Sequence, residues 1–412
     1  MTLPARTAVL MFLSFAFAYF PSALVRGVVA TLAPAFSAEL ALSAANLGLL
    51  AGAYFLGFAV MQLPLGSALD RFGPKRVLLV FLAVAVAGCG AFALARGFAA
   101  LTVARSLIGV GVSACLMAPM TSFRRNFGPT AQMRANSWML MTGSLGLVAS
   151  TLPVQWLLPV LGWRGLFWGL ALLFVLAMVL IARVVPADVR AAPASAPASV
   201  GGYAQVFRHP TFLRYLPMGF FQYGSMVALQ SLWVGPWLTR VCGWSAQQTA
   251  AGLFAINVSM LLAFMAWGVA VPRLYARGWT AHGLIAWGMP LSLVTLFLGV
   301  VLGRDATAWV WALFCVSSTF VSLSQPAIGQ AFPASLAGRA LSAYNLVIFA
   351  GIFVLQWSTG AVIDTLMALG WGTVSAFRGA FALMGACSAL SYLWFLWRDE
   401  PSPARTSTVH TR

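Results

Sequence analysis

The chain has 412 residues, of which 61% are hydrophobic and only 8% are charged. Soluble globular proteins carry about 25% charged residues, so the composition excludes a soluble globular protein. The formal net charge of +17 points toward nucleic acid, but the positions of the basic residues along the chain assign that charge to a membrane.

Apolar stretches long enough to cross ~30 Å of hydrocarbon as helices recur along the whole chain. We predict an all-α polytopic membrane protein, because a backbone in lipid must satisfy its hydrogen bonds within its own segment. The first stretch is too long for a signal-peptide core, so we expect it to be retained. The twelve predicted spans are 8–40, 44–65, 77–95, 101–122, 135–158, 165–185, 212–239, 248–271, 281–302, 306–329, 340–363 and 376–397.

Arg26 is the most informative residue of the first span. Ser43 is expected to cap the second helix, so the first helix ends near Leu40 and Arg26 lies ~21 Å below that end. An arginine at this depth is costly in lipid and marks a functional site by default. No acidic residue lies nearby in sequence. Its partner is then an anionic substrate, which a guanidinium matches with two hydrogen bonds. The alternative is an arginine that snorkels outward or bonds backbone carbonyls.

The segment 66–76 is a short charged insert between the second and third spans, and it holds one of the 7 acidic residues. Gly66 and Gly73 allow tight turns and close helix approach. Asp70 can stabilise the N-terminus of a helix from the other half of the molecule. The alternative is a basic turn that only sets the orientation in the membrane.

Residues 186–211 form the long polar break of the chain and are rich in Pro, Ala, Ser and Gly, which is typical of a flexible linker. We therefore predict four parts. They are an N-terminal six-helix bundle at 1–185, a cytoplasmic linker at 186–211, a C-terminal six-helix bundle at 212–400 and a disordered cytoplasmic tail at 401–412.

The two predicted bundles carry matching motifs at equivalent positions. The segment 66–71 is matched by 268–273 between the eighth and ninth spans, and Arg164-Gly165 before the sixth span is matched by Arg378-Gly379 before the twelfth. These repeats indicate an internal duplication and two pseudo-symmetric bundles. Duplicated transporters place their substrate site at the interface of the halves, near the middle of the membrane.

The basic residues are divided unequally between the two sides of the predicted membrane. With a cytoplasmic N-terminus, five of the 24 Lys and Arg residues fall outside, two lie within spans, and the rest fall in the cytoplasm. This asymmetry predicts an inner-membrane protein with both termini cytoplasmic. The basic charge then faces lipid headgroups of the bilayer, and we expect no nucleic-acid partner. The five outer residues are Arg96, Arg164, Arg240, Arg304 and Arg378.

Polar and aromatic residues at helical spacing inside the spans supply candidates for a substrate pocket. Each of them can instead form hydrogen bonds between helices. Together with Arg26, the candidates for substrate binding are Tyr19, Tyr54, Gln222, Gln230, Trp233, Asn257, Asn345 and Gln356. No P-loop, dinucleotide fingerprint or clustered metal ligands occur, so we expect no cofactor, no metal and no enzyme activity.

The segment 66–76 resembles the loop signature G-x-x-x-D-R-x-G-x-[RK] of the major facilitator superfamily. In the second copy, Pro272 stands where the signature has aspartate, and Arg105-x3-Gly109-x-Gly111 resembles a looser motif of the family. The resemblance implies a twelve-helix fold and alternating access. It also implies that Asp70 meets helix 11 in a cytoplasmic latch. The residues assigned to this switch are Gly66, Asp70, Arg71, Gly73, Lys75, Arg105 and Arg273.

The pattern of Tyr19, Arg26, Pro34 and Glu39 in the first span is similar to that of anion-handling branches of the superfamily. These branches are the organophosphate/phosphate exchangers and the organic-anion symporters. The organic-anion branch carries an acidic residue on helix 4, where this chain has Val112-Ser113. Anion exchange, or symport with the proton carried on substrate or water, therefore fits better than a protein acid that binds the proton.

We predict a monomeric secondary transporter of a small organic or phosphorylated anion in a bacterial inner membrane, with protons or a counter-anion as its coupling partner. The first alternative is a proton-coupled exporter of drugs or metabolites. Such exporters carry a Gly-Pro pair on helix 5, and the region 143–146 of this chain lacks it. The second alternative is a membrane receptor or scaffold, which has no need for a buried arginine or a duplicated gate.

Overall fold

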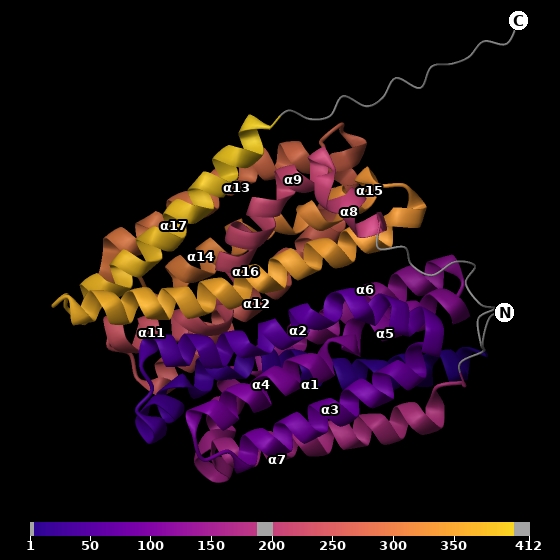
Figure 1. The fold of residues 1–412 in the computed structure, drawn as a ribbon, viewed down its shortest axis with the longest axis horizontal. Helices are drawn as coiled ribbons and strands as arrows, with labels where there is room; N and C mark the ends of the chain where they lie inside the picture. The colour runs from indigo at the N-terminus through magenta and orange to yellow at the C-terminus, as the bar shows by residue number, and fades with distance from the viewer. Residues whose placement is uncertain (1–3, 188–200, 399–412) are drawn as a thin grey trace, which may run out of the picture.

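The computed structural model describes residues 4–187 and 201–398, and all regular structure within them is helical (Figure 1). The predicted all-α polytopic fold is confirmed. The first group of elements is α1 Ala5–Leu40, α2 Ala44–Phe72, α3 Pro74–Leu94, α4 Phe98–Val112, α5 Ala114–Asn126, α6 Pro129–Ala149 and α7 Leu152–Val184.

The second group begins with α8 Gly201–Arg208, inside the predicted linker, and the predicted tail lies outside the described residues. It continues with α9 Pro210–Pro217, η1 Met218–Tyr223, α10 Gly224–Ala228, η2 Leu229–Trp233, α11 Val234–Pro236, η3 Trp237–Val241, α12 Ala246–Ala276, α13 Ala281–Leu302, η4 Gly303–Asp305, α14 Ala308–Ser318, η5 Thr319–Leu323, α15 Ser324–Ala331, α16 Ala334–Ala368 and α17 Thr373–Trp397.

Ten helices of the described residues are long and apolar enough to cross a membrane. The predicted fifth and seventh spans are not among them because both are interrupted. The fifth is divided between α6 and the first part of α7, and the chain reverses at Gly162, whose φ of 62° favours glycine. The seventh runs from Pro210 to Val241 through six short pieces.

Local sequence explains where the first helices end. Ser43 caps α2 as predicted, because its hydroxyl accepts a hydrogen bond from the Asn46 N–H at 3.2 Å. Gly73 separates α2 from α3 with a φ of 83°, and Pro74 starts α3. The predicted tight turn at Gly73 is therefore present.

The seventh span contains three π-helical segments, η1, η2 and η3. Such segments widen the helix locally and are frequent at functional sites. They carry three of the predicted pocket residues, Gln222 in η1 and Gln230 and Trp233 in η2. The widened turns therefore set the directions in which these side chains leave the helix.

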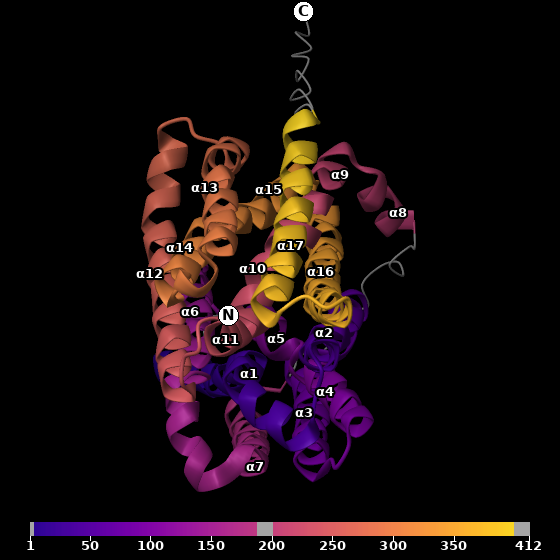
Figure 2. The ribbon, with the colours of Figure 1, turned by 90° about the vertical axis from the view of Figure 1, so that its left-hand side faces the viewer.

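The elements form two groups that pack against each other. In Figures 1 and 2, α1–α7 (indigo to magenta) lie together, and α8–α17 (rose to yellow) lie beside them. The most extensive contact between the groups joins α2 and α16, which lie side by side in both views. The helices run between two faces. The terminal face carries the start of α1, the end of α17 and the turn 72–74, and the distal face carries the turns 40–44 and 368–373.

Candidate substrate site and gates

Arg26 lies near the centre of the molecule, where the two groups of helices meet. It belongs to α1, and its charge acts on the hydroxyls of Tyr19 in α1, Tyr54 in α2 and Tyr223 in η1. Its side chain is partly exposed. Among the described residues, no carboxylate pairs with its guanidinium. Tyr19, Tyr54 and, from the other half, Tyr223 therefore lie within the electrostatic reach of Arg26. Substrate binding by these residues stays a prediction.

The tyrosines differ in how they are held. Tyr54 is 1% exposed and packs edge-on against Phe55, with ring centroids 5.0 Å apart. Tyr19 lies against Gly143 of α6, where an added Cβ would come within 2.9 Å of the Tyr19 hydroxyl. Tyr223 is partly exposed. A positive charge with phenol hydroxyls in its neighbourhood can bind an anion through charge-assisted hydrogen bonds.

Arg105 lies beside the Tyr54 ring and not with the charged segment 66–76, although the sequence assigned it to the switch. Its side chain is fully buried, and its Cζ atom lies 5.0 Å from the centroid of the Tyr54 ring. Its Nη2 atom approaches the Arg26 carbonyl oxygen at 3.5 Å. The motif on α4 singles out Arg105 but does not predict its position beside Tyr54, because that position depends on how α1, α2 and α4 pack.

Three of the predicted pocket amides take part in two side-chain pairs within the second group. Gln230 donates to Asn257 at 2.9 Å, which joins η2 to α12. Gln325 donates to Asn345 at 2.9 Å, which joins α15 to α16. Both pairs are partly exposed. They link helices of the second group and present amide groups from that side.

The remaining predicted pocket residues are used in packing. Gln222 donates to Ser292 of α13 at 2.8 Å, and Gln356 donates to Ser231 of η2 at 2.9 Å. The indole N–H of Trp233 donates to the Gln356 carbonyl at 3.2 Å, and this indole is 0% exposed. These three residues hold the second group together. The Oε1 atoms of both glutamines are buried without a partner among the described residues, so each amide keeps one free acceptor.

The two groups are closed against each other at the distal face. The carboxylate of Asp364, near the end of α16, accepts the N–H of Ala44 at 3.0 Å and the N–H of Ala45 at 2.8 Å. These are the first amides of α2, so the acid caps a helix start across the interface. Gly360 fits beside the same backbone, since an added Cβ would lie 2.6 Å from the Ala44 carbonyl carbon. A Cβ at Gly48 would lie 3.2 Å from the Trp233 ring.

The charged turn at the terminal face makes no comparable contact. Asp70 has a 67% exposed side chain and lies 3.9 Å from Arg125 of α5. An added Cβ at Gly66, inside α2, would meet open space, so the predicted close approach is not formed in this state. Arg71 stacks on its neighbour Phe72 with its Cζ 5.0 Å from the ring centroid. The start of α16 has no side-chain cap.

Two further basic residues of the predicted switch have local roles. Lys75 donates to the carbonyls of Ala182 at 2.8 Å and Val185 at 2.5 Å, so it closes the C-terminal end of α7. Arg273 donates to the Val269 carbonyl of its own helix, α12, at 3.3 Å. Lys75 therefore ties the signature turn to the start of the linker.

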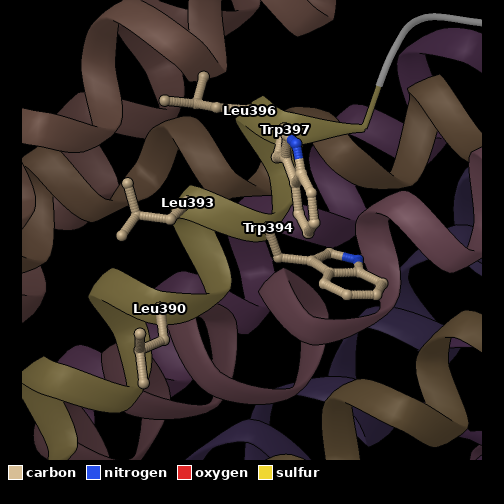
Figure 3. Close-up of a pocket in the computed structure, with 5 residues that line it drawn as sticks. All are labelled: Leu390, Leu393, Trp394, Leu396 and Trp397. Atoms are coloured by element: carbon tan, nitrogen blue, oxygen red, sulfur yellow. The ribbon is translucent and has the colours of Figure 1, made fainter.

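An apolar groove on α17 contains none of these residues. Figure 3 shows its lining on the last turns of the helix, and the Trp397 side chain is 83% exposed. Exposed tryptophans at a helix end are typical of the membrane interface. We assign this surface to lipid contact. It is lined by Leu390, Leu393, Trp394, Leu396 and Trp397.

The described residues contain no group of three or more His, Cys, Asp or Glu side chains that could hold a metal ion. The acids of this part of the chain lie near helix ends. Glu39, for example, accepts hydrogen bonds from Trp163 and Arg164, both at 2.6 Å, and fastens the end of α1 to α7. The charged groups near the centre of the described chain are therefore guanidinium groups with phenol groups beside them, and not carboxylates.

The chain is similar to known transporters in sequence and in fold. A profile of the Major Facilitator Superfamily matches residues 15–356. A cis,cis-muconate transport protein of Acinetobacter baylyi is 26% identical over 333 residues, which cover 75% of this chain and 76% of that protein. A hexuronate transporter of Bacillus subtilis is 35% identical over 107 residues, 26% of this chain and 25% of that protein. The crystal structure of a bacterial homolog of the human lysosomal transporter Spinster, inward-facing and unoccupied, has a TM-score of 0.75 and 16% identity, and the match covers 97% of this chain and 100% of that one.

Proposed function

Because the chain belongs to the major facilitator superfamily, it is a multi-pass membrane transporter of a small molecule and not an enzyme, and we propose that its substrate is an organic or phosphorylated anion. The observation that carries this proposal is Arg26. Its guanidinium lies between the two halves and has no acidic partner among the described residues. A substrate anion would supply the missing charge with two hydrogen bonds.

The names of the relatives support the same class of substrate. Muconate and hexuronate are organic acids, and both relatives are named as transporters of them. Coupling to a protein acid has little support, because the described acids lie near helix ends, away from Arg26. We propose exchange with a counter-anion, or symport in which the proton travels on substrate or water.

We propose that the terminal face is cytoplasmic and that the protein lies in a bacterial inner membrane, because the basic residues gather on that face. The contact of Asp364 with α2 then seals the outer side, and the exposed Asp70 marks an open inner side. Transport by alternating access would exchange these two arrangements around Arg26. We propose the bundles 1–185 and 212–400 as the moving parts.

If Asp70 latches the two halves at the terminal face, the variant Asp70→Asn should change the ratio of inward-open to outward-open protein. In the outward-open state, Asp70 would cap the start of α16, and a charge at a helix start contributes about 0.3–2 kcal/mol. The variant should therefore favour the inward-open state by roughly 2- to 30-fold. Distances between spin labels on the two halves at the terminal face measure this ratio. An unchanged distance distribution would mean that the segment 66–76 is no latch and only sets the orientation of the protein in the membrane.

Uptake into proteoliposomes tests the proposed function directly. The purified protein should take up at least one carboxylate, phosphate ester or sulfonate, and should leave neutral sugars and lipophilic cations outside. Liposomes without protein provide the background rate. If lipophilic cations move and no anion does, the proton-coupled exporter becomes the better reading and the anion proposal fails.

A further inference from the structure

Arg105 is a second cation whose role in transport is open. Its side chain is 0% exposed, and its Nε and Nη1 atoms have no hydrogen-bond partner among the described residues. Its Nη2 atom reaches the Arg26 carbonyl oxygen at 3.5 Å, which is long for a hydrogen bond. A guanidinium buried with so few partners is costly, so its presence calls for a compensating charge.

The acids of the described chain do not supply that charge. Glu39 is held by Trp163 and Arg164, and Asp364 is held by the first amides of α2. Asp70 pairs with Arg125. No ion pair to Arg26 or Arg105 exists in the part of the chain that the structure describes. The centre of the first helix group therefore carries two positive charges and no negative one.

Tyr54 connects the two arginines. Its ring lies 5.0 Å from the Arg105 Cζ atom, and the charges of both Arg26 and Arg105 act on its hydroxyl. Arg105 is fully buried and its Nη2 atom lies 3.5 Å from the Arg26 carbonyl oxygen, so the two arginines are neighbours in the fold. In a low-dielectric interior, the potentials of two nearby cations add and are poorly screened. An anion held at Arg26 therefore experiences both charges.

We propose that Arg105 is a specificity-determining residue and that the transported anion is a dianion. This inference rests on the proposed function, because it assigns a charge to the anion held at Arg26. A dianion neutralises both guanidinium groups, whereas a monoanion leaves one positive charge uncompensated in the membrane interior. Arg105 is fully buried and acts on the anion at a distance, so it selects by charge and not by shape.

Matched pairs of substrates test the proposal in proteoliposomes. Dicarboxylates of several chain lengths are each compared with their monoamides, and phosphate monoesters with their methyl diesters. We expect at least one dianion to be taken up roughly tenfold better than its monoanionic partner. Arg105→Gln should bring that ratio close to unity, and Arg105→Lys, which keeps the charge, should retain it. The pairs that show the preference identify the dianion as a carboxylate or a phosphate ester.

Two results would overturn the proposal. The first is a wild-type protein that transports each monoanion as well as its dianion, which needs no variant and so does not depend on the folding of Arg105→Gln. The second is an unchanged ratio in an Arg105→Gln protein that elutes as a folded species in size-exclusion chromatography. Failure of the proposed function gives a different result, since neither member of any pair would then be taken up.

Discussion

Arg26→Ala is expected to reduce anion uptake by roughly a hundredfold or more. Hydrogen bonds to a charged group contribute about 1.5–3 kcal/mol each, and the variant removes up to two of them together with the charge. Arg26→Lys keeps the charge but loses the planar pair of donors, so a smaller loss of roughly tenfold is expected. Initial rates in proteoliposomes, measured at several substrate concentrations, separate the change in KM from the change in maximal rate.

The matched control for this prediction is Arg96→Ala, which removes an exposed positive charge on the turn between α3 and α4. It should leave uptake close to that of the wild type. If Arg26→Ala transports anions at the wild-type rate while it remains folded, Arg26 is a structural residue. The anion proposal would then lose the observation on which it rests.

Gly360→Ala is expected to shift the protein away from the state described here and to slow transport. The added Cβ would lie 2.6 Å from the Ala44 carbonyl carbon and 2.8 Å from the Ala45 nitrogen, so the backbones must separate. Overpacking of this kind costs about 1–3 kcal/mol, which corresponds to a shift of roughly 5- to 150-fold. In the proposed outward-open state the distal ends would be apart, and the methyl group would meet no obstacle.

Spin labels on the turns 40–44 and 368–373 report this shift as a longer distance across the distal face. Gly169→Ala is the control, because Gly169 also lies within a helix and its Cβ would meet open space. If the distance across the distal face is unchanged in Gly360→Ala and uptake is normal, α2 and α16 accommodate the methyl group by a small shift. The close contact at Gly360 would then not determine the closed state.

The sequence was a reliable guide wherever one residue acts on its own helix. Apolar length predicts the spans, the Ser43 cap marks the start of α2, and Gly73 marks the turn that follows it. It was a poor guide to partners. Gln222 is a polar residue inside a span, as expected for a pocket. In the structure it lies in the π-helical turn η1 and its amide donates to Ser292. Local propensity does not contain this information, because the widening of the seventh helix depends on tertiary packing.

The central charges show the same limit. The depth of Arg26 in its span is enough to predict a site residue, and this stays a prediction. Arg105 was grouped with the loop signature because its motif follows that of the turn. Its place beside Tyr54 follows from a close approach of α2 and α4, in which a Cβ at Gly109 would lie 2.8 Å from the Tyr54 carbonyl carbon. Contacts of this kind are set by pairs of helices, and a single sequence gives no measure of them.

The reach of Asp364 to the first amides of α2 bears on how the empty protein resets. α2 and α16 run in opposite directions, so each begins where the other ends, and each carries an aspartate near its own end, at Asp70 and Asp364. If Asp70 caps α16 in the outward-open state, one full stroke breaks a carboxylate-to-helix contact at one end of this pair and forms its equivalent at the other. Such an exchange leaves the two resting states close in energy. The two gates then add little bias of their own, and the direction of net flux is left to the gradients of the cargo and its coupling partner.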